Sequence, residues 1–219
     1  MINIILIAPP AAGKGTQAAL ISGHYHIPHI STGDLLRASV QNKDEFSKDL
    51  EKQLASGHLV SDEIVFSLLK KRISNLDCKN GFILDGFPRN LKQAEHYDEI
   101  LNDLYINKVI VILIDVDFEI AQSRITGRLL CPKCGSTYND SIEEMKPQME
   151  NTCDRCQSKL IKRSDDNLET YNIRYQNYME KTEPLIEYYD NKKMLYRVDG
   201  NKSSEHIYEE IDQILKKYL

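Results

Sequence analysis

The stretch from residue 8 to residue 16, APPAAGKGT, most constrains what this chain can fold into. It follows an apolar, β-branched run at Ile2–Ile7 and precedes Gln17–Ile21, whose residues are compatible with a helix. A strand, a Gly-Lys loop and a helix in this order form a phosphate-binding site, because backbone N–H groups of the loop and the helix converge on an anion. Lys14 would contact the outer phosphates, and the Thr16 hydroxyl would ligate Mg²⁺.

Two positions in this loop depart from the usual pattern. Ala8 and Ala11 stand where phosphate-binding loops commonly have glycine. Alanine disfavours positive φ angles, so Ala11 is the residue that fits the expected loop least well. The alternative interpretation is an ordinary strand–turn–helix unit that contains Gly-Lys-Gly by chance.

The overall charge excludes some classes of partner. The chain has 219 residues, with 28 lysines and arginines against 33 aspartates and glutamates and a net charge of −5. Nucleic-acid binding requires a basic face, so we expect no nucleic-acid partner. No apolar run approaches the ~20 residues of a membrane span, and the first residues do not resemble an export signal. We therefore expect a cytoplasmic protein with no membrane partner, whose cysteines are reduced or metal-bound.

Further apolar runs indicate strands that alternate with helices. Strands are predicted at Gly81–Asp85, Val109–Ile114 and Met194–Val198, with a short one ending near Ile30. Val109–Ile114 is apolar on both faces, as a buried parallel strand is. The alternation predicts an α/β fold, a P-loop NTPase-like, doubly wound parallel sheet flanked by helices.

Two segments interrupt this alternation and are predicted to be insertions. The expected core comprises residues 1–31, 61–128 and 163–219. Residues 32–60 are expected to form a small helical pair, whereas residues 129–162 contain four cysteines, turn residues and few aliphatic side chains. The residues expected to cap helix N-termini are Ser31, Ser61, Asn90, Asp117 and Ser203.

Asp85 is the acidic residue best placed to support a phosphate loop. It ends a predicted buried strand and is followed by Gly86–Arg89, which breaks that strand. An acid at this position helps to hold Mg²⁺ in P-loop enzymes, and the contact is expected through bound water because Mg²⁺ keeps its hydration shell. The alternative is a common Asp-Gly turn.

Six arginines lie at motif positions or near the ends of elements: Arg37, Arg89, Arg124, Arg128, Arg163 and Arg174. Arg124 and Arg128 are one helical turn apart and are expected to share a face, as are Arg163 and Arg174 if the chain between them is helical. The planar guanidinium group suits phosphate oxygens. Phosphoryl transfer between two nucleotides needs many such donors, since positioning and charge neutralisation supply most of its catalysis. For any single arginine the alternative is a surface salt bridge.

Four cysteines form a C-x₂-C…C-x₂-C pattern: Cys131, Cys134, Cys153 and Cys156. Two such pairs can surround a tetrahedral Zn²⁺, and four thiolates leave no open position, so this metal would be structural. Disulfide pairing is the alternative. Cys78 lies apart from the others and is expected to be a small buried apolar residue. His24, His26 and His29 crowd one loop and are a weaker candidate for a metal site.

In combination, these motifs resemble one known family. The chain resembles the adenylate kinases, in particular the bacterial long type whose lid carries four zinc-binding cysteines. The resemblance runs from the first strand to the last helix. The motifs that carry it are Gly13–Thr16, Ser31–Asp34, Asp85–Arg89, Arg124–Arg128 and Arg163–Asp166.

The resemblance implies roles for individual residues. ATP would be bound by Ala11, Ala12, Gly13, Lys14, Gly15, Thr16, Arg128, Thr137, Tyr138 and Lys202. AMP would be bound by Thr32, Arg37, His58, Leu59, Val60, Gly86, Phe87, Pro88, Arg89, Gln93, Arg163 and Arg174. The catalytic set would be Lys14, Asp85, Arg89, Arg124, Arg128, Arg163 and Arg174. Gln93 would read the adenine edge of AMP, and Asp165 and Asp166 would pair with lid arginines in a closed state.

The activity that the resemblance implies is reversible transfer of the γ-phosphoryl group of Mg·ATP to AMP, which gives two ADP. The enzyme would be a monomer with a structural Zn²⁺, and the two insertions would close over AMP and ATP to exclude water. Two other functions stay open. One is a UMP/CMP kinase, which usually has a shorter lid than residues 129–162, and the other is a non-catalytic, zinc-stabilised nucleotide-binding module.

Overall fold

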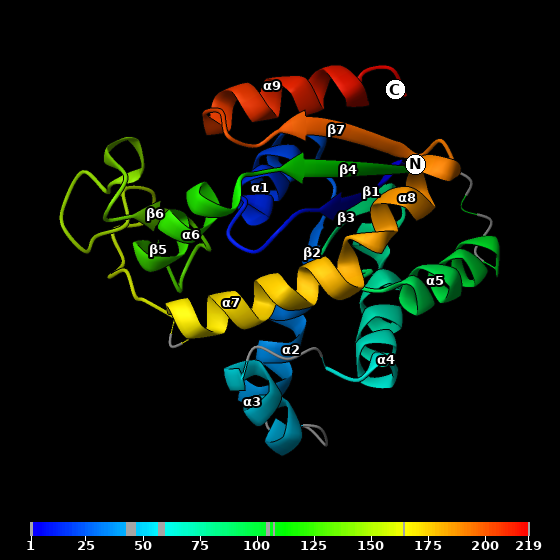
Figure 1. Ribbon diagram of the computed structural model, residues 1–219, viewed down its shortest axis with the longest axis horizontal. Coiled ribbons are helices and arrows are strands. Elements are labelled where there is room, and N and C mark those ends of the chain that lie inside the picture. The colour runs from blue at the N-terminus through cyan, green and yellow to red at the C-terminus, as the bar shows by residue number, and fades with distance from the viewer. Residues whose placement is uncertain are drawn as a thin grey trace.

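The computed structural model contains a five-stranded parallel sheet (Figure 1). It describes residues 2–42, 47–56, 60–103, 106, 108–163 and 165–218. The strand order is β2-β3-β1-β4-β7, and every neighbouring pair is parallel. The strands are β1 (Ile2–Ile7), β2 (His29–Ser31), β3 (Gly81–Asp85), β4 (Val109–Asp115) and β7 (Leu195–Asp199). All five predicted strands are therefore present, and the α/β fold class is confirmed.

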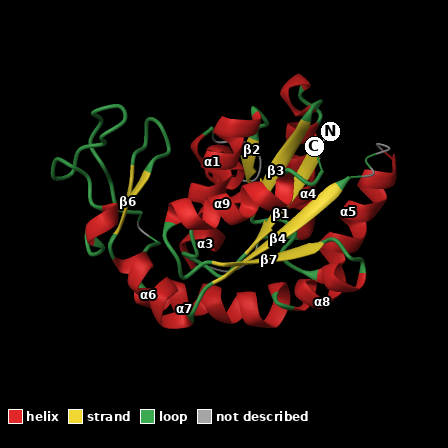
Figure 2. Cartoon of the chain, turned by 90° about the horizontal axis from the view of Figure 1, so that it is seen from above, coloured by secondary structure: helices red, strands yellow, loops and turns green. Residues whose placement is uncertain are grey.

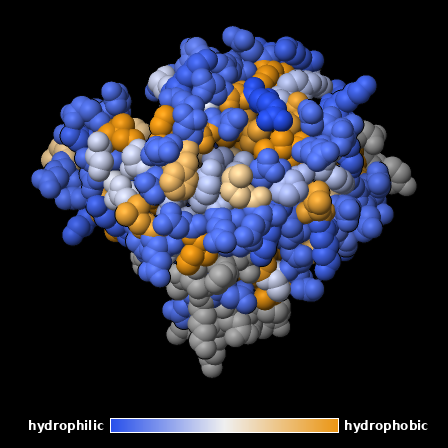
Figure 3. All heavy atoms as spheres, viewed as in Figure 1, coloured by the Kyte–Doolittle hydropathy of each residue, from blue (hydrophilic) through white to orange (hydrophobic). Residues whose placement is uncertain are grey.

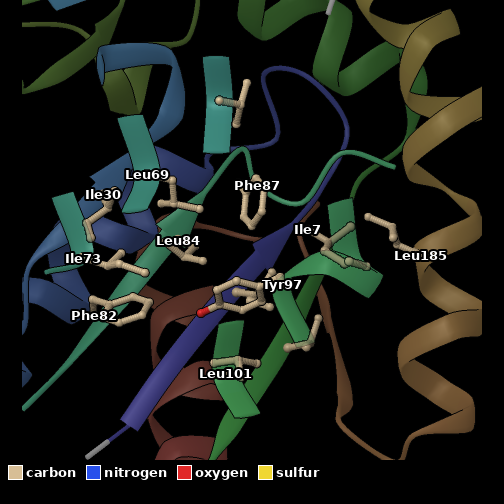
Figure 4. Packing of buried hydrophobic residues seen from close by; sticks show 14 of the residues in the cluster. Ile7, Ile30, Leu69, Ile73, Phe82, Leu84, Phe87, Tyr97, Leu101 and Leu185 are labelled. Carbon is tan, nitrogen blue, oxygen red and sulfur yellow. The ribbon is translucent and has the colours of Figure 1, made fainter. Parts of the chain in front are cut away.

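The central strands β1, β3 and β4 contribute side chains to both faces of the sheet, as their apolar runs predict. Ile5 and Ile7 of β1 belong to one buried cluster, whereas Ile4 and Leu6 belong to another. The first cluster also contains Phe87, Tyr97 and Leu185, which approach the sheet from outside it (Figure 4). Two hydrophobic cores therefore lie on the two faces of the sheet, which explains why its central strands show no regular alternation of polar and apolar residues.

Helices cover both faces of the sheet (Figure 2). The cluster that contains Ile4 and Leu6 is completed by α1 (Lys14–Tyr25), α6 (Phe118–Thr126), α7 (Leu168–Asn177) and α9 (Ser204–Leu215). The cluster that contains Ile5 and Ile7 is completed by α4 (Asp62–Ile73), α5 (Leu91–Asp103) and α8 (Pro184–Asn191). A short 3₁₀ turn, η1 (Leu76–Cys78), buries Cys78 in the cluster that contains Ile5 and Ile7, as expected.

Three of the five predicted N-caps form capping hydrogen bonds. Ser31, Asn90 and Ser203 each accept a hydrogen bond from the backbone N–H three residues ahead. Ser61 and Asp117 precede helices as predicted, but their side chains make no capping bond. Both residues are exposed, so water can satisfy the first N–H groups of these helices.

The predicted helical pair between residues 32 and 60 consists of α2 (Thr32–Gln41) and α3 (Ser47–Ser56). It follows β2 directly, since α2 begins at the residue after Ser31. In Figure 1 this pair projects below the sheet, away from the cysteine-bearing end of the molecule. Leu36 and Leu50 are buried and connect the pair to the core beneath α4.

Residues 129–162, here called the cysteine segment, stand apart from the main sheet (Figure 2). They contain β6 (Thr137–Asn139), which pairs antiparallel with β5 (Arg128–Leu130), and a 3₁₀ turn, η2 (Glu143–Met145). Their own buried cluster is small and consists of Leu129, Cys131, Cys153 and Leu160. This cluster is separate from the two cores that enclose the sheet.

One feature of the last helices was not predicted. The chain leaves the cysteine segment through α7 and then forms a π-helical turn, Tyr178–Thr182, before α8 (Figure 1). A π turn differs from an α-helix by one inserted residue, and periodicity over a short window does not reveal it.

Among the described residues, no helix is both long and apolar enough to cross a bilayer. On the face drawn in Figure 3, the coloured hydrophobic side chains form small groups between hydrophilic ones.

Candidate functional site

A cavity of about 1300 Å³ lies at the carboxyl ends of β1 and β3. The chain crosses from β3 over β1 to β4, so β1 lies at the point where the winding of the sheet reverses. Ligands of open α/β sheets bind at such a point. Pockets for one small molecule have volumes of roughly 300–1000 Å³, so this central cavity has room for more than one ligand group.

Most of the sequence-predicted site residues line this central cavity. They are Ala11, Ala12, Gly13, Lys14, Gly15, Thr16, Thr32, Arg37, Val60, Asp85, Gly86, Pro88, Arg89, Gln93, Arg124, Arg128, Thr137, Tyr138, Arg163, Arg174 and Lys202. His58 and Leu59 lie outside the described residues. Phe87 does not line the cavity, because its ring is fully buried between those of Phe66 and Tyr97.

The loop between β1 and α1 has the backbone that a phosphate cradle requires. Gly13 has φ of 89° and directly precedes α1, whose first residue is Lys14. Ala11 has φ of 63°, so this residue adopts the left-handed conformation that alanine usually disfavours. The N-terminus of α1 faces the central cavity with no side chain as its cap, which leaves its N–H groups available to an anion.

Lys14 folds back over its own loop. Its Nζ atom donates hydrogen bonds to the carbonyl oxygens of Ala8 (2.7 Å) and Pro9 (3.1 Å). Burial lowers the pKa of Lys14 to about 8; Asp85 opposes this shift, and the charges of Arg89 and Arg128 add to it. The charged ammonium is thus poorly compensated here, so a bound anion beside it would be stabilised.

Asp85 ends β3 opposite this loop, as predicted. Its Oδ2 atom lies 3.3 Å from Nε2 of His29, which is the first residue of β2. Burial opposes ionisation of Asp85, but the hydrogen bond with His29 and the charges of Lys14 and Arg89 outweigh it and lower the pKa. Asp85 is therefore a buried carboxylate next to the loop, as a magnesium-supporting acid should be.

The turn after β3 is closely packed around Gly86. This residue has φ of 80°, and a Cβ atom here would come within 2.8 Å of both Arg89 Nη2 and Thr32 Oγ1. Its carbonyl oxygen accepts hydrogen bonds from Arg89 Nε (2.7 Å) and Thr32 Oγ1 (2.8 Å). Burial lowers the pKa of Arg89, and Asp85 partly offsets this effect. The Arg89 guanidinium is thus fixed beside the cavity by the backbone of its own turn.

Two further arginines are paired with carboxylates. Arg128 forms an ion pair with Asp166, including a 2.7 Å hydrogen bond from Nε to Oδ2, and Arg174 pairs with Asp165. Arg128, the arginine expected to contact ATP from the lid, begins β5 and pairs with Asp166, whereas the partner of Asp165 lies in α7. The pairing expected in a closed state stays a prediction.

Arg163 lines the central cavity and is half-buried. Its Nε atom is buried and has no hydrogen-bond partner among the described residues. Burial lowers its pKa, and the positive charges of Arg37 and Arg128 lower it further. A buried guanidinium nitrogen that lacks an acceptor suits an anionic ligand.

The prediction that Arg124 and Arg128 share a helix face was wrong, and the condition set for Arg163 and Arg174 is not met, although all four arginines line the central cavity. Arg124 lies in α6, which ends at Thr126, whereas Arg128 belongs to β5. Gly127 separates the two elements, so no continuous helix carries both arginines. Arg163 precedes α7, which begins at Leu168, and therefore does not share a helix with Arg174.

Three further cations are anchored at the edges of the cavity. Nη1 of Arg124 donates to the carbonyl oxygen of Gly200 at 3.1 Å. Arg37 pairs with Asp34 at 2.5 Å on α2, and Lys202 pairs with Glu210 at 2.8 Å near α9. Cations from several elements of the fold therefore surround one cavity.

The four cysteines of the cysteine segment form one cluster. Their sulfur atoms all lie within 4.8 Å of one another. Cys131 and Cys156 are 3.3 Å apart and Cys134 and Cys153 are 3.5 Å apart, whereas a disulfide requires about 2.05 Å. A tetrahedral metal with Zn–S bonds of about 2.3 Å places sulfurs roughly 3.8 Å apart, so this cluster fits such an ion.

The two cysteine pairs are built in the same way. Gly135 and Gln157, which directly follow the pairs, both have positive φ angles, and their N–H groups donate to the carbonyl oxygens of Cys131 and Cys153. These matching knuckles aim all four sulfurs inward. Among the described residues, this is the only cluster of histidines, cysteines and acids found suitable for a metal, so the alternative site at His24, His26 and His29 is not formed there.

Tyr138 connects the cysteine cluster to the central cavity, which it lines. Its hydroxyl lies 3.5 Å from Cys153 Sγ and accepts a 2.9 Å hydrogen bond from the backbone N–H of Asp154. Burial raises the pKa of Tyr138 to about 12. The tyrosine expected to contact ATP is therefore also held by the cysteine segment.

Sequence reasoning missed several residues that line the cavity, among them Arg155, Asn177 and Thr182. Arg155 lies inside the second cysteine pair, where its positive charge is the only signal in the sequence that could have indicated a role in the site. Thr182 ends the π-helical turn, and no local pattern pointed to it.

Comparisons with known proteins agree with this geometry. The family model described as "Adenylate kinase" matches residues 6–194. The chain is 46% identical over 213 residues to an adenylate kinase of Clostridium tetani, which covers 97% of this chain and 98% of that protein. It is 46% identical over 215 residues to an adenylate kinase of Archaeoglobus fulgidus (98% of each chain) and 45% identical over 213 residues to one of Thermoanaerobacter sp. (97% of each). The chain therefore belongs to the adenylate kinase family.

Proposed function

We propose that this chain catalyses the reversible transfer of a phosphoryl group from Mg·ATP to AMP, which gives two ADP. The relatives above are named adenylate kinases. The observation that supports the proposal best is the central cavity, in which the loop before α1 and the Gly86–Arg89 turn face a common space lined by cations. A single-nucleotide binder has no need of the second, arginine-lined half.

The donor half would bind Mg·ATP. The phosphates would contact the backbone of residues 11–16 and the Lys14 ammonium. Thr16 and Asp85 would hold the accompanying Mg²⁺, the latter through water. Arg128, Thr137, Tyr138 and Lys202 line the cavity on the side that would take the rest of ATP.

The acceptor half would bind AMP beside β3 and α2. Its phosphate would contact Arg37, Arg89, Arg163 and Arg174, and Gln93 would contact the base. Thr32, Val60 and Gly86 line the same part of the cavity, with Pro88 next to them. His58, Leu59 and Phe87 stay expectations carried by the family resemblance.

Catalysis would depend on positioning and charge neutralisation. Lys14 and the arginines Arg89, Arg124, Arg128, Arg163 and Arg174 would offset the charge that spreads over the transferred group. No covalent enzyme intermediate is required. Closure of residues 32–60 over AMP and of the cysteine segment over ATP would exclude water, which competes with AMP as the acceptor.

The metal in the cysteine segment would be Zn²⁺ with a structural role. The four sulfurs fit a tetrahedral ion and leave no coordination position for a substrate. The segment's own buried cluster is too small to stabilise it alone. We further propose a monomeric, cytoplasmic enzyme that binds neither nucleic acid nor membranes.

The test is ADP formation by the purified protein with ATP as donor and AMP, CMP, UMP or GMP as acceptor. We expect AMP to be the preferred acceptor by a large factor. Preference for UMP or CMP would favour the pyrimidine nucleotide kinases instead. Tight ATP binding without ADP formation from any acceptor would favour a non-catalytic binding module.

A further inference from the structure

The side-chain amide of Gln93 is held at both of its ends. Its Oε1 atom accepts a hydrogen bond from the backbone N–H of Arg89 at 2.7 Å. Its Nε2 atom donates to Oδ1 of Asp62 at 2.6 Å. Gln93 is almost fully buried, with 2% of its surface exposed, and it lines the central cavity. The amide is therefore fixed where the acceptor base is expected to lie.

The chemistry of these partners allows only one orientation of the amide. A backbone N–H can only donate a hydrogen bond, and an ionised carboxylate can only accept one. Rotation of the amide by 180° would place its NH₂ against the N–H of Arg89 and its oxygen against Asp62, so both contacts would become repulsive. After the two observed bonds, one N–H and one oxygen lone pair of Gln93 stay free for a ligand.

Asp62 acts from outside the nucleotide cavity. It is the first residue of α4 and lines a separate, shallow surface pocket of about 380 Å³ together with Asn90 and Glu180. Its Oδ1 atom also accepts from Asn90 Nδ2 at 3.2 Å. Asp62 therefore does not line the space proposed for the substrate, and any influence on the base passes through Gln93.

The second partner of Gln93 is itself held by the π-helical turn. Thr182 Oγ1 donates to the carbonyl oxygen of Arg89 at 2.9 Å. The Arg89 residue is thus hydrogen-bonded through its N–H to Gln93 and through its carbonyl to Thr182. Asp62 of α4 therefore holds the Gln93 amide directly, whereas the π-helical turn acts on it only through Arg89.

We propose that Asp62 is a positioning residue that sets base selectivity by fixing the orientation of Gln93. This inference rests on the proposed function, in which Gln93 contacts the acceptor base. Adenine offers a 6-amino donor beside the N1 acceptor, whereas the 6-oxopurines hypoxanthine and guanine offer an acceptor at position 6 and a donor at N1. An amide of fixed orientation can match only one of these arrangements, while a freely rotating amide can match both.

The experiment compares the acceptors AMP and IMP, because these nucleotides differ only at position 6 and at the N1 proton. The measured quantity is the ratio of kcat/KM for AMP to kcat/KM for IMP at saturating Mg·ATP. For Asp62→Ala we expect this ratio to fall roughly tenfold, since a hydrogen bond to a charged partner is lost. The loss should appear mainly as a higher KM for AMP and a lower KM for IMP, with kcat changed less.

Two variants separate this role from a general structural one. Asp62→Asn keeps an oxygen that can accept from Gln93 Nε2, so we expect it to retain the selectivity of the wild type within about threefold. Glu63→Ala removes the neighbouring exposed acid from the same first turn of α4 and should leave the ratio unchanged. If Asp62→Ala does not fold, Thr182→Val loosens the other partner of Gln93 and should lower the ratio in the same direction.

An unchanged AMP/IMP ratio in folded Asp62→Ala would overturn the proposal. So would an equal loss of selectivity in Asp62→Asn, because the acceptor geometry would then be irrelevant. Failure of the wild-type protein to use AMP would instead refute the proposed function itself, and it is measured in the same assay.

Discussion

The five-stranded core and the cysteine segment bury their side chains by different means. The core packs two apolar clusters against the two faces of one sheet, and strand residues such as Ile5 and Val111 are fully buried. The cysteine segment buries only a few side chains, two of which are cysteines of the four-sulfur cluster. A large apolar area can stabilise a fold without a metal, whereas a small polar segment requires a cross-link.

Because of this difference, the polar residues of the core serve the reaction, whereas the cysteines of the cysteine segment serve its stability. In the core, the polar groups that face the cavity project from the ends of an apolar scaffold, so they are free to bind anions. In the cysteine segment, the reactive thiols are themselves the scaffold. Substitution of a polar residue that faces the cavity should therefore lower turnover more than stability. Substitution of a cysteine in the cysteine segment should lower stability more than turnover.

The largest expected effect is on turnover. Replacement Lys14→Met removes the ammonium beside the loop, and we expect kcat for ADP formation to fall about 10³-fold because the phosphate charge is no longer offset. The free energy of unfolding should not fall, since desolvation already lowers the pKa of Lys14 and its charge therefore does not stabilise the fold. Lys79→Met, an exposed control, should change neither quantity. A Lys14→Met protein that keeps near-normal kcat would contradict the view that the polar groups at the cavity of the core serve the reaction.

The next effect concerns the metal. Protein prepared without chelators should contain about one Zn²⁺ per chain, and Cys131→Ser should lose most of it. We expect the cysteine segment of this variant to unfold at a lower temperature than in the wild type, while kcat at low temperature falls less than about tenfold.

Metal analysis and thermal unfolding followed by circular dichroism measure this prediction. Cys78→Ala is the matched control, because Cys78 is buried but lies outside the four-cysteine cluster. It should retain the metal in full. A Cys131→Ser protein with unchanged metal content and unfolding temperature would refute the structural role of the cluster.

A third prediction compares the same substitution in the two regions. Leu113→Ala in β4 should lower the global free energy of unfolding by about 2–5 kcal/mol, because it opens a cavity beside the sheet. Leu160→Ala in the cysteine segment should lower it by less than about 1 kcal/mol, since the proposed metal would supply most of the stability of that segment. Its effect should appear instead as faster amide exchange within residues 129–162. Equal global losses would show that the segment and the core unfold as one unit.

The smallest predicted effect concerns backbone strain. Ala11 in the core loop and Gln157 in the second cysteine knuckle both have positive φ angles. Ala11→Gly and Gln157→Gly should each relieve up to about 1 kcal/mol of left-handed strain. Urea unfolding should report the first, and amide exchange in the cysteine segment the second. A loss of stability in both variants would mean that chain entropy outweighs this strain.

Much of the fold could be predicted because it depends on local patterns. The runs at Ile2–Ile7 and Val109–Ile114 are apolar on both faces, and only a buried parallel strand requires that pattern. The cysteine cluster was also predictable, since its four ligands are fixed by a short spacing. The cavity-lining loop, including Lys14, followed from its position between a strand and a helix.

The features that could not be predicted depend on long-range contacts. The Arg128–Asp166 pair joins the start of β5 to the segment before α7, so the family resemblance implied such a pair but no local pattern links the two residues. The hold on Gln93 requires Asp62, Arg89 and the π-helical turn to meet. The wrong assignments of Arg124 with Arg128 to one helix face arose because helical spacing was extended across Gly127, where the helix ends.

The alternation of side chains along β1 has a consequence for how the length of this sequence can vary. Ile5 and Ile7 enter one core, and Ile4 and Leu6 enter the other. One inserted residue within β1 would exchange all of these side chains between the two cores and rotate the following loop away from Asp85. An insertion in the exposed stretch between β6 and the second cysteine pair would disturb no such alternation. Changes in chain length should therefore be tolerated there and be lethal to the fold in β1.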